Sequence, residues 1–461
     1  MSELLKQKVL RKDRTFAAIL AVILIGRLGF AALVYARPAL AFANDSDRYI
    51  PIANAILSGR AYAWNTERPA ELLNTIGYPL FLAGVVGVLG HEAGDVALAQ
   101  LLLSGALTAV MFVTLRASLG TTPAFIAAFL LALDPLTILW SMTILTETLF
   151  ASMLGIGAVM LTRWAATKKL VTLVQAGVFS GLACLVRPYG LLIVLVWAAA
   201  VFAFRPQLGG DRIGARSVRV KRAFVFVLPS ILLIVPWVFR NALLWDCPTL
   251  SSVDRVTLRD YMAAKVIAET EHIGLEAAQA RLQEADPGVC PQDTSGYWRI
   301  IVSHPGIYAK LHMGGTAAIV IATSFDRWLQ YLGFNYDLPD LWTPFMDDGF
   351  GGLLKAVGAE WAHVPWAIGL MFALTAWQLL LYLLALAAVQ AYRHFSVDFR
   401  WSVIVLIVGL LLLVLLPGQG GHERFRVPVQ PLLAILIGYG TASRTISRPR
   451  KAVLQQSTQG A

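Results

Sequence analysis

The stretch that decides the fold is TFAAILAVILIGRLGFAALVYA, residues 15–36, followed directly by RPALAFANDSDRY, residues 37–49. The first stretch carries one charge, Arg27, and is long enough for a helix to cross a bilayer, which takes about 20 residues. It follows the basic residues 1–14 and has no small-residue cleavage site, so we expect it to stay in place as a signal anchor. A polar segment with two aspartates comes immediately after it.

The composition of the whole chain supports a membrane protein. Of 461 residues, 57% are hydrophobic and 14% are charged, and the mean hydropathy is +0.65. Soluble domains average about 45–50% apolar and about 25% charged residues. A soluble enzyme, a disordered protein and a disulfide-dense secreted module are therefore excluded.

Apolar stretches of helical length recur along the chain without the alternation of a barrel strand. The sequence predicts an all-α polytopic membrane protein of about ten transmembrane helices. A further apolar piece, Tyr78–Gly90, is too short to cross comfortably and is expected at the interface; an eleventh span is the alternative. The ten expected spans are 15–36, 96–115, 121–138, 146–163, 170–186, 189–204, 223–239, 365–391, 401–416 and 428–442.

Basic loops set the predicted topology, because Lys and Arg remain on the cytoplasmic side. The loop 205–222 holds six basic residues against a single acid. This places both termini in the cytoplasm and the protein in the inner membrane, with 78–90 not crossing. We expect an N-terminal module 1–240 with a first outer loop 37–95, a periplasmic insertion 241–363, and a C-terminal part 364–461.

The insertion carries its own predictions. Cys247 and Cys290 fall on the oxidising side, where a disulfide is expected; two free, buried cysteines are the alternative. Cys184 lies in a span and is expected to serve packing. The segment 254–285 is predicted to be helical, and 300–322 is predicted to be an amphipathic helix on the membrane.

Carboxylates at a membrane boundary are costly unless they are solvated, paired or used. Asp45 and Asp47 follow the first span, and the alternative to a functional role is a helix cap. Glu147 stands at the outer mouth of the span 146–163, where a helix dipole would also favour it. If Asp45 and Glu147 face one cavity, they suit acid–base chemistry or a divalent metal.

Several basic residues lie on the outer side, against the charge bias of the loops. Arg187 ends one span, and His422, Glu423, Arg424 and Arg426 precede the last one. Two explanations are open for arginines on the outer side. They extend to lipid headgroups, or their guanidinium groups bind a phosphate.

Other chemistries lack their motifs. No Walker loop, GxGxxG after a strand, HExxH or CxxC pair occurs, so ATP, NAD and structural zinc have no support. Basic residues outside the loops that flank spans form no nucleic-acid motif, so no nucleic-acid partner is expected.

Five short motifs, taken in order, resemble those of the C-type (GT-C) glycosyltransferases, in particular the dolichyl-phosphate-mannose–protein mannosyltransferase-like and aminoarabinose-transferase-like branch, family 39-like. The likeness covers about residues 10–240 and, more loosely, 365–440. The motifs are DSDRY at 45–49, GYPLFLA at 77–83, TETLF at 146–150, GLACLVRP at 181–188 and RFRVP at 424–428.

The resemblance implies transfer of a sugar from a polyprenyl-phosphate carrier to a glycan, lipid or protein acceptor on the outer face, with inversion. Asp45 would be the general base, and Glu147 a second carboxylate that holds the acceptor or a divalent metal. The leaving phosphate would be stabilised by Arg187, Arg424 and Arg426. Some members carry two adjacent acids, whereas Ser46 follows Asp45 here. The other substrate-binding candidates are Asp47, Arg48, Tyr49 and His422.

Two other functions compete with this one. A polytopic transporter would use polar groups at mid-membrane, for which Arg27 and Asp134-Pro135 are the hints. A polysaccharide polymerase or ligase would also use lipid-linked glycans. Convergence of Asp45, Glu147, Arg187 and Arg424 on one outer cavity would favour the transferase.

Overall fold

A computed structural model describes most of the chain. The described residues are 3–43, 45–59, 72–204, 212–286, 294–334, 365–394 and 396–442, together with 348, 351–352, 354–356 and 358–359. Within these ranges the regular elements are helices, and no strand occurs. The predicted all-α class is confirmed.

The elements before the insertion are α1 (Glu3–Leu28), α2 (Ala31–Ala36), η1 (Pro38–Ala41), α3 (Ser46–Leu57), α4 (Gly77–Val88), α5 (Ala93–Leu119), α6 (Thr121–Ala132), α7 (Pro135–Ser141), α8 (Glu147–Thr167), α9 (Leu170–Val186), α10 (Gly190–Ala203) and α11 (Arg212–Trp245). The insertion holds α12 (Val253–Val256), η2 (Thr257–Ala263), α13 (Ala264–Glu271), α14 (Leu275–Ala285), α15 (Ser295–Ser303), α16 (Pro305–Ile321) and α17 (Phe325–Leu332). The last elements are α19 (Pro365–Gln390), η3 (Ala391–His394), α20 (Val397–Leu415), η4 (Gly418–Gly420), η5 (Glu423–Arg426) and a helix over 429–442.

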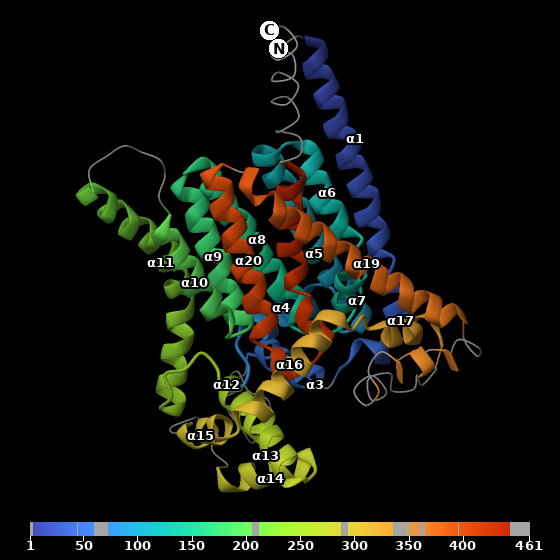
Figure 1. The fold of residues 1–461 in the computed structure, drawn as a ribbon, viewed down its shortest axis with the longest axis vertical. Helices are drawn as coiled ribbons and strands as arrows, with labels where there is room; N and C mark the ends of the chain where they lie inside the picture. The colour runs from blue at the N-terminus through green and yellow to red at the C-terminus, as the bar shows by residue number, and fades with distance from the viewer. Residues whose placement is uncertain are drawn as a thin grey trace.

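The bundle is built around α8 (Figure 1). Of the most apolar stretch of α8, 78% is buried, against 22% for the segment Lys12–Ala36 of α1 and α2 and 17% for α11, so α8 is central and the others lie at the periphery. α8 packs against α5 and α9, and α9 packs against α11. Trp164 of α8 and Trp197 of α10 are fully enclosed in this core.

Among the described residues, six helical segments are long and apolar enough to cross a membrane. The expected span 121–138 is instead two helices, α6 and α7, bent by 50°, and counting this pair gives up to seven spans. α4, α9 and α10 are shorter apolar helices. An integral membrane protein is thus supported, whereas the count of ten spans is not confirmed.

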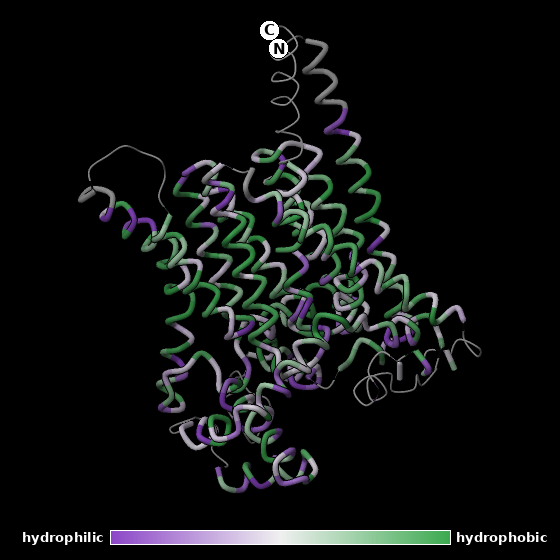
Figure 2. Tube along the Cα trace, viewed as in Figure 1, coloured by the Kyte–Doolittle hydropathy of each residue, from purple (hydrophilic) through white to green (hydrophobic). Residues whose placement is uncertain are grey.

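The two ends of the bundle differ. The beginning of α1 and the end of the helix 429–442 lie at one end, here called the terminal end (Figure 1). The helices α12–α15 lie beyond the other, here called the insertion end, and hydrophilic residues gather on them (Figure 2). α4 has 12 residues, about 18 Å of helix, so it is too short for a hydrocarbon core of about 30 Å.

The insertion is helical, as predicted, but more divided. The segment 254–285 is interrupted by a π-helical stretch, Thr257–Ala263, and by His272, whose φ is +56°. The expected helix 300–322 breaks before Pro305, which starts α16, because proline disfavours helical backbone in the residue before it. α16 packs against η4, η5 and α13.

The sequence predicts a disulfide between Cys247 and Cys290 and a packing role for Cys184. Cys184 is free and buried, which agrees with packing. Cys247 is buried and disulfide-bonded. Cys290 lies outside the described residues, so its pairing with Cys247 stays a prediction.

Candidate active site

Asp45 stands at the start of α3 but does not cap it. Its backbone is helical, with φ −89° and ψ −14°, and its side chain makes no capping hydrogen bond. Ser46 fixes the turn instead: its hydroxyl accepts from the Ala43 N–H at 2.9 Å and donates to the Ile144 carbonyl at 2.8 Å. The Asp45 side chain is 34% exposed, so its carboxylate remains available to a substrate.

Glu147 occupies the first turn of α8 and is fully buried. Arg187, the residue after α9, donates from Nη2 to Glu147 Oε1 and from Nε to the Thr146 hydroxyl at 2.6 Å. Desolvating a carboxylate is costly unless it is paired, and Arg187 provides the pair. The motif residues of α8 and the α9–α10 turn thus form one unit.

The position of Arg187 depends on a close approach between α4 and α9. A Cβ on Gly77 would overlap the Leu185 carbonyl, so only glycine allows α4 to lie this near. The Thr75 hydroxyl donates to the Val186 carbonyl at 2.9 Å, immediately before Arg187. The glycine at the start of the second motif therefore helps to hold the arginine of the fourth.

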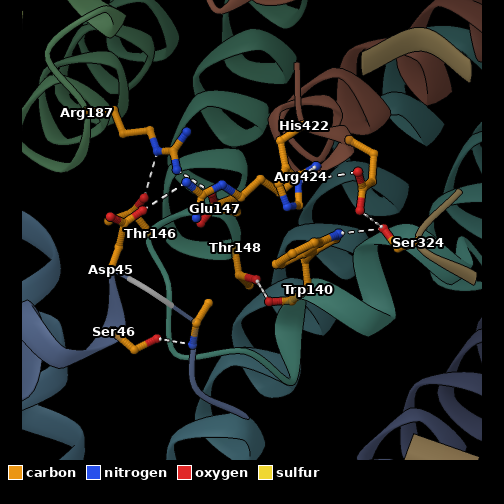
Figure 3. A network of polar contacts seen from close by, with 12 residues as sticks. Asp45, Ser46, Trp140, Thr146, Glu147, Thr148, Arg187, Ser324, His422 and Arg424 are labelled. Carbon is orange, nitrogen blue, oxygen red and sulfur yellow. Dashed lines mark hydrogen bonds and ion pairs between the residues drawn. The ribbon is translucent and has the colours of Figure 1, made fainter. Parts of the chain in front are cut away.

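Arg424 joins the two carboxylates (Figure 3). Its Nη2 donates to Asp45 Oδ2 at 2.8 Å, and its Nε lies 3.5 Å from Glu147 Oε1. Asp45, Glu147, Arg187 and Arg424 come from four separate segments, and the structure gathers all four in one site. The sequence singles out the meeting of these four side chains as the observation that favours a transferase over a transporter.

Phe425 supports both guanidinium groups. Its ring centroid lies 5.4 Å from Cζ of Arg187 and 5.3 Å from Cζ of Arg424, which are cation–π distances. A guanidinium carries five N–H donors, and the contacts above use only some of them. Two arginines with spare donors beside one accessible carboxylate form a site suited to an anionic ligand.

The other residues of the first motif lie at the edge of this site. Asp47 is exposed on α3, and no contact of its side chain joins it to the site. Arg48 Nη1 is 4.0 Å from Asp45 Oδ1. The Tyr49 ring lies edge-on to Tyr78 at 4.9 Å, and burial raises the pKa of its phenol to about 12. Tyr49 thus packs against Tyr78 close to the site, and its role as a substrate-binding residue stays a prediction.

Arg426, grouped from sequence with the other two arginines, turns away from them. Its Nη1 donates to the Ile319 and Val320 carbonyls at 2.7 and 2.8 Å, and the residue is 2% exposed. This arginine holds the C-terminal end of α16 and is not placed to meet a substrate.

His422 lies beside the site. Its Nδ1 accepts from the Arg424 N–H at 3.3 Å, and its ring lies edge-on to Trp140 at 5.3 Å. Burial, with a smaller effect of the nearby arginines, lowers the pKa of His422 below 6.5, although Glu423 acts in the opposite direction. A neutral imidazole at this position is a candidate hydrogen-bonding group.

A divalent metal between the two carboxylates would need the position that Arg424 holds. In the part of the chain that the structure describes, no three His, Cys, Asp or Glu side chains come together as metal ligands. Asp45 and Glu147 are each paired with a guanidinium instead. This donor set does not fit a divalent metal.

Sequence reasoning missed four residues of this network. Thr146 and Phe425 lie inside the quoted motifs, whereas Trp140 and Ser324 lie outside them. Ser324 accepts a hydrogen bond from the Trp140 indole and donates one to Glu423 (Figure 3). The sequence signal for Thr146 is a polar residue inside a quoted motif, whereas the sequence at Ser324 indicates only a helix cap.

Three comparisons with known proteins bear on this chain. Residues 74–239 match the family model of the dolichyl-phosphate-mannose-protein mannosyltransferases, a segment that includes Glu147 and Arg187. No curated protein sequence matches the chain.

Among solved structures, the chain is similar to the archaeal oligosaccharyltransferase AglB from Archaeoglobus fulgidus, in complex with an inhibitory peptide and a dolichol-phosphate, at 13% identity and a TM-score of 0.47. That likeness covers 96% of this chain but only 52% of AglB, so the chain spans about half the length of that protein. ArnT from Cupriavidus metallidurans is similar in its apo state, with a TM-score of 0.39, 13% identity and coverage of 96% of this chain and 78% of ArnT. ArnT bound to undecaprenyl phosphate gives 0.36 at 13% identity, with 94% and 78% covered.

The matched family segment runs from α4 to α11 and contains half of the four-residue site. Over this segment, a little more than a third of its length, the chain is similar to the dolichyl-phosphate-mannose-protein mannosyltransferases.

Proposed function

We propose that this protein is a membrane glycosyltransferase that moves a sugar from a polyprenyl-phosphate carrier to an acceptor at the insertion end. The observation that carries the proposal is the position of Arg424, which contacts the exposed carboxylate of Asp45 and the buried carboxylate of Glu147 at once. Arg424 thereby holds Asp45, the candidate base, beside the guanidinium groups that form the candidate phosphate site.

The arginines suit the leaving group. As the bond between the anomeric carbon and the phosphate oxygen breaks, negative charge grows on the polyprenyl phosphate. Arg187 and Arg424 would stabilise that charge with donors already oriented by Glu147 and Phe425. Stabilising charge that develops in the transition state is often the largest catalytic contribution.

Asp45 suits the acceptor. It would take the proton of the acceptor hydroxyl as that oxygen bonds to the anomeric carbon from the face opposite the phosphate, which inverts the configuration. The base must be accessible and ionised, and Asp45 is the most exposed of the four site residues. The Asp45–Arg424 contact keeps its carboxylate oriented while the acceptor enters.

The charge pattern supports a site on the outer face of the inner membrane. The beginning of α11, which is the described part of the basic segment 205–222, lies toward the terminal end, and the site at the starts of α3 and α8 lies toward the insertion end (Figure 1). With the positive loops inside, both termini would be cytoplasmic and the site periplasmic. Nucleotide sugars are absent from that side, which agrees with a lipid-linked donor.

The acceptor would meet the insertion 241–363, which lies between the two transmembrane parts 1–240 and 364–461. Its helices α12–α15 have a small core of their own, including Leu258, Ile267 and Ile301. The transferred sugar, whether a hexose or a pentose, is to be found by experiment.

The test is transfer from a panel of radiolabelled polyprenyl-phosphate sugars in membranes, with wild type and Asp45→Asn compared. Label that reaches an acceptor only with wild type supports the transferase and identifies the sugar. Equal transfer by the two proteins contradicts the role of Asp45. Absence of transfer from every donor, with intact protein, would favour the transporter.

A further inference from the structure

Ser324, between α16 and α17, has an unusual conformation for a serine. Its φ is +54° and it is 4% exposed. Residues other than glycine rarely adopt positive φ, and such strain concentrates at functional sites. A serine in front of a helix normally caps it, yet the hydroxyl of Ser324 makes no capping bond.

The hydroxyl is used across the fold instead. It donates to Glu423 Oε1 at 2.7 Å and accepts from the Trp140 indole N–H at 3.2 Å (Figure 3). Glu423 immediately precedes Arg424 in η5, and Trp140 lies in α7. One side chain of the insertion thus contacts the element that carries the bridging arginine.

The same corner, residues 322–327, also holds the segment that leads to Asp45. Arg327 Nη2 donates to the Leu40 carbonyl at 2.7 Å and to the Phe42 carbonyl at 3.2 Å. Its guanidinium lies 5.0 Å from the Trp140 ring. The corner therefore contacts both chain segments whose side chains, Asp45 and Arg424, meet in the site.

The C-terminal half of α16 supports the loop 418–426. A Cβ on Gly315 would overlap the Gly418 carbonyl, so helix and loop lie in backbone contact there. In the last turn of α16, the Ile319 and Val320 carbonyls accept from Arg426. The loop is held at three places by one helix and its following corner.

We propose that Ser324 is a positioning residue: through Glu423 it sets the place of Arg424, and hence the Asp45–Arg424 pair, for sugar transfer. This inference rests on the proposed function. Because Ser324 belongs to the insertion, the part of the chain expected to receive the acceptor also fixes the geometry of the reacting groups. A shift of about 1 Å in such groups is enough to lower a rate about a hundredfold.

Ser324→Gly is the decisive variant, because glycine accepts the positive φ and removes the CH2OH side chain with its two hydrogen bonds. We expect transfer kcat/KM to fall about ten- to a hundredfold while the protein stays folded. Ser324→Asn also tolerates positive φ and supplies a donor and an acceptor, so it should restore most of the activity. Ser303→Gly, at an exposed serine of the insertion, is the matched control and should transfer like wild type.

Combination with Glu423→Ala separates positioning from general loss of structure. If Ser324 acts through Glu423, Ser324→Gly should cause no further loss in the Glu423→Ala background. Losses that multiply would overturn the inference, as would wild-type transfer by Ser324→Gly or by Glu423→Ala. If Ser324→Gly does not fold, Ser324→Ala and Ser324→Asn form the comparison.

If the protein is not a sugar transferase, the same variants give a different result. Wild type would then transfer no sugar, and the positioning role would be read from amide hydrogen exchange of residues 418–427. Faster exchange in Ser324→Gly than in Ser303→Gly supports the positioning role, and equal exchange overturns it.

Discussion

Asp45 and Asp134 both precede a short helix, yet they do different things. Asp134 has an extended backbone, caps α7 by accepting from the Thr137 N–H at 2.8 Å, and also accepts from the Trp377 indole at 3.1 Å. Asp45 has a helical backbone, leaves α3 uncapped and turns to Arg424. A cap needs the extended conformation, so the backbone, and not the residue type, decides which aspartate is free for chemistry.

Replacing each aspartate by asparagine tests the difference between Asp45 and Asp134 with the largest expected effect. Asp45→Asn should lower transfer kcat/KM by about 10²–10⁴-fold, because the amide keeps the shape and loses the base. Asp134→Asn should retain transfer per folded molecule, because asparagine caps a helix as well as aspartate does. Both rates are measured at equal amounts of folded protein. Comparable losses in the two variants would remove the distinction.

Glu147 extends the comparison to a carboxylate that is fully buried. Glu147→Gln should destabilise the fold by about 3–5 kcal/mol, because Arg187 loses its buried partner. Glu271→Gln, which removes an exposed pair with Arg281, should cost less than about 1 kcal/mol. Unfolding in detergent measures both. A loss for Glu147→Gln no greater than that for Glu271→Gln would show that the pair is dispensable.

Arg424→Lys sharpens the role of the partner of Asp45. An ammonium group is a point charge and is not able to span Asp45 and Glu147 as the guanidinium fork does. We expect transfer to fall by about 10²–10³-fold, as for loss of an oriented charge-stabilising donor. Arg281→Lys, in an exposed ion pair, is the control and should leave the rate unchanged. Full activity of Arg424→Lys would mean that positive charge alone suffices.

The smallest effect concerns His422. Burial lowers its folded-state pKa below 6.5, so on acidification the unfolded chain binds a proton before the folded protein does. Stability should therefore decline as the pH falls from about 6.5 towards the folded pKa. His422→Gln should flatten that decline in thermal unfolding. The groups facing the ring are Glu423, Arg424, Glu147 and Arg327. An unchanged decline would assign the pH dependence to another group.

The sequence predicts the site well where short motifs lie at the ends of the expected spans, on one side of the membrane. Asp45, Glu147, Arg187 and Arg424 meet as expected, because charged residues at one end of a bundle have few other partners. It also groups Arg426 with Arg187 and Arg424, whereas in the structure Arg426 contacts the end of α16. In the three-residue turn of η5, positions two apart point in different directions, so only Arg424 faces the carboxylates.

Other features depend on tertiary contacts that no local pattern reveals. Ser324 has the sequence of a helix cap, and only the fold shows that its hydroxyl contacts Glu423. The sequence of the expected span 121–138 carries a signal for the bend, because Asp134 precedes Pro135 and a residue before proline avoids the helical conformation. A prediction from the length of the apolar stretch alone does not use that signal.

In the proposed reaction the arginines bind the donor phosphate and Asp45 takes the acceptor proton, and one measurement separates these roles. Binding and single-turnover release of polyprenyl phosphate from a saturating donor, with acceptor present, are compared in wild type, Asp45→Asn and Arg424→Ala. We predict that Asp45→Asn binds the donor like wild type without releasing polyprenyl phosphate, whereas Arg424→Ala binds the donor weakly. Release near the wild-type rate by Asp45→Asn, or equal loss of donor binding in both variants, would contradict the account.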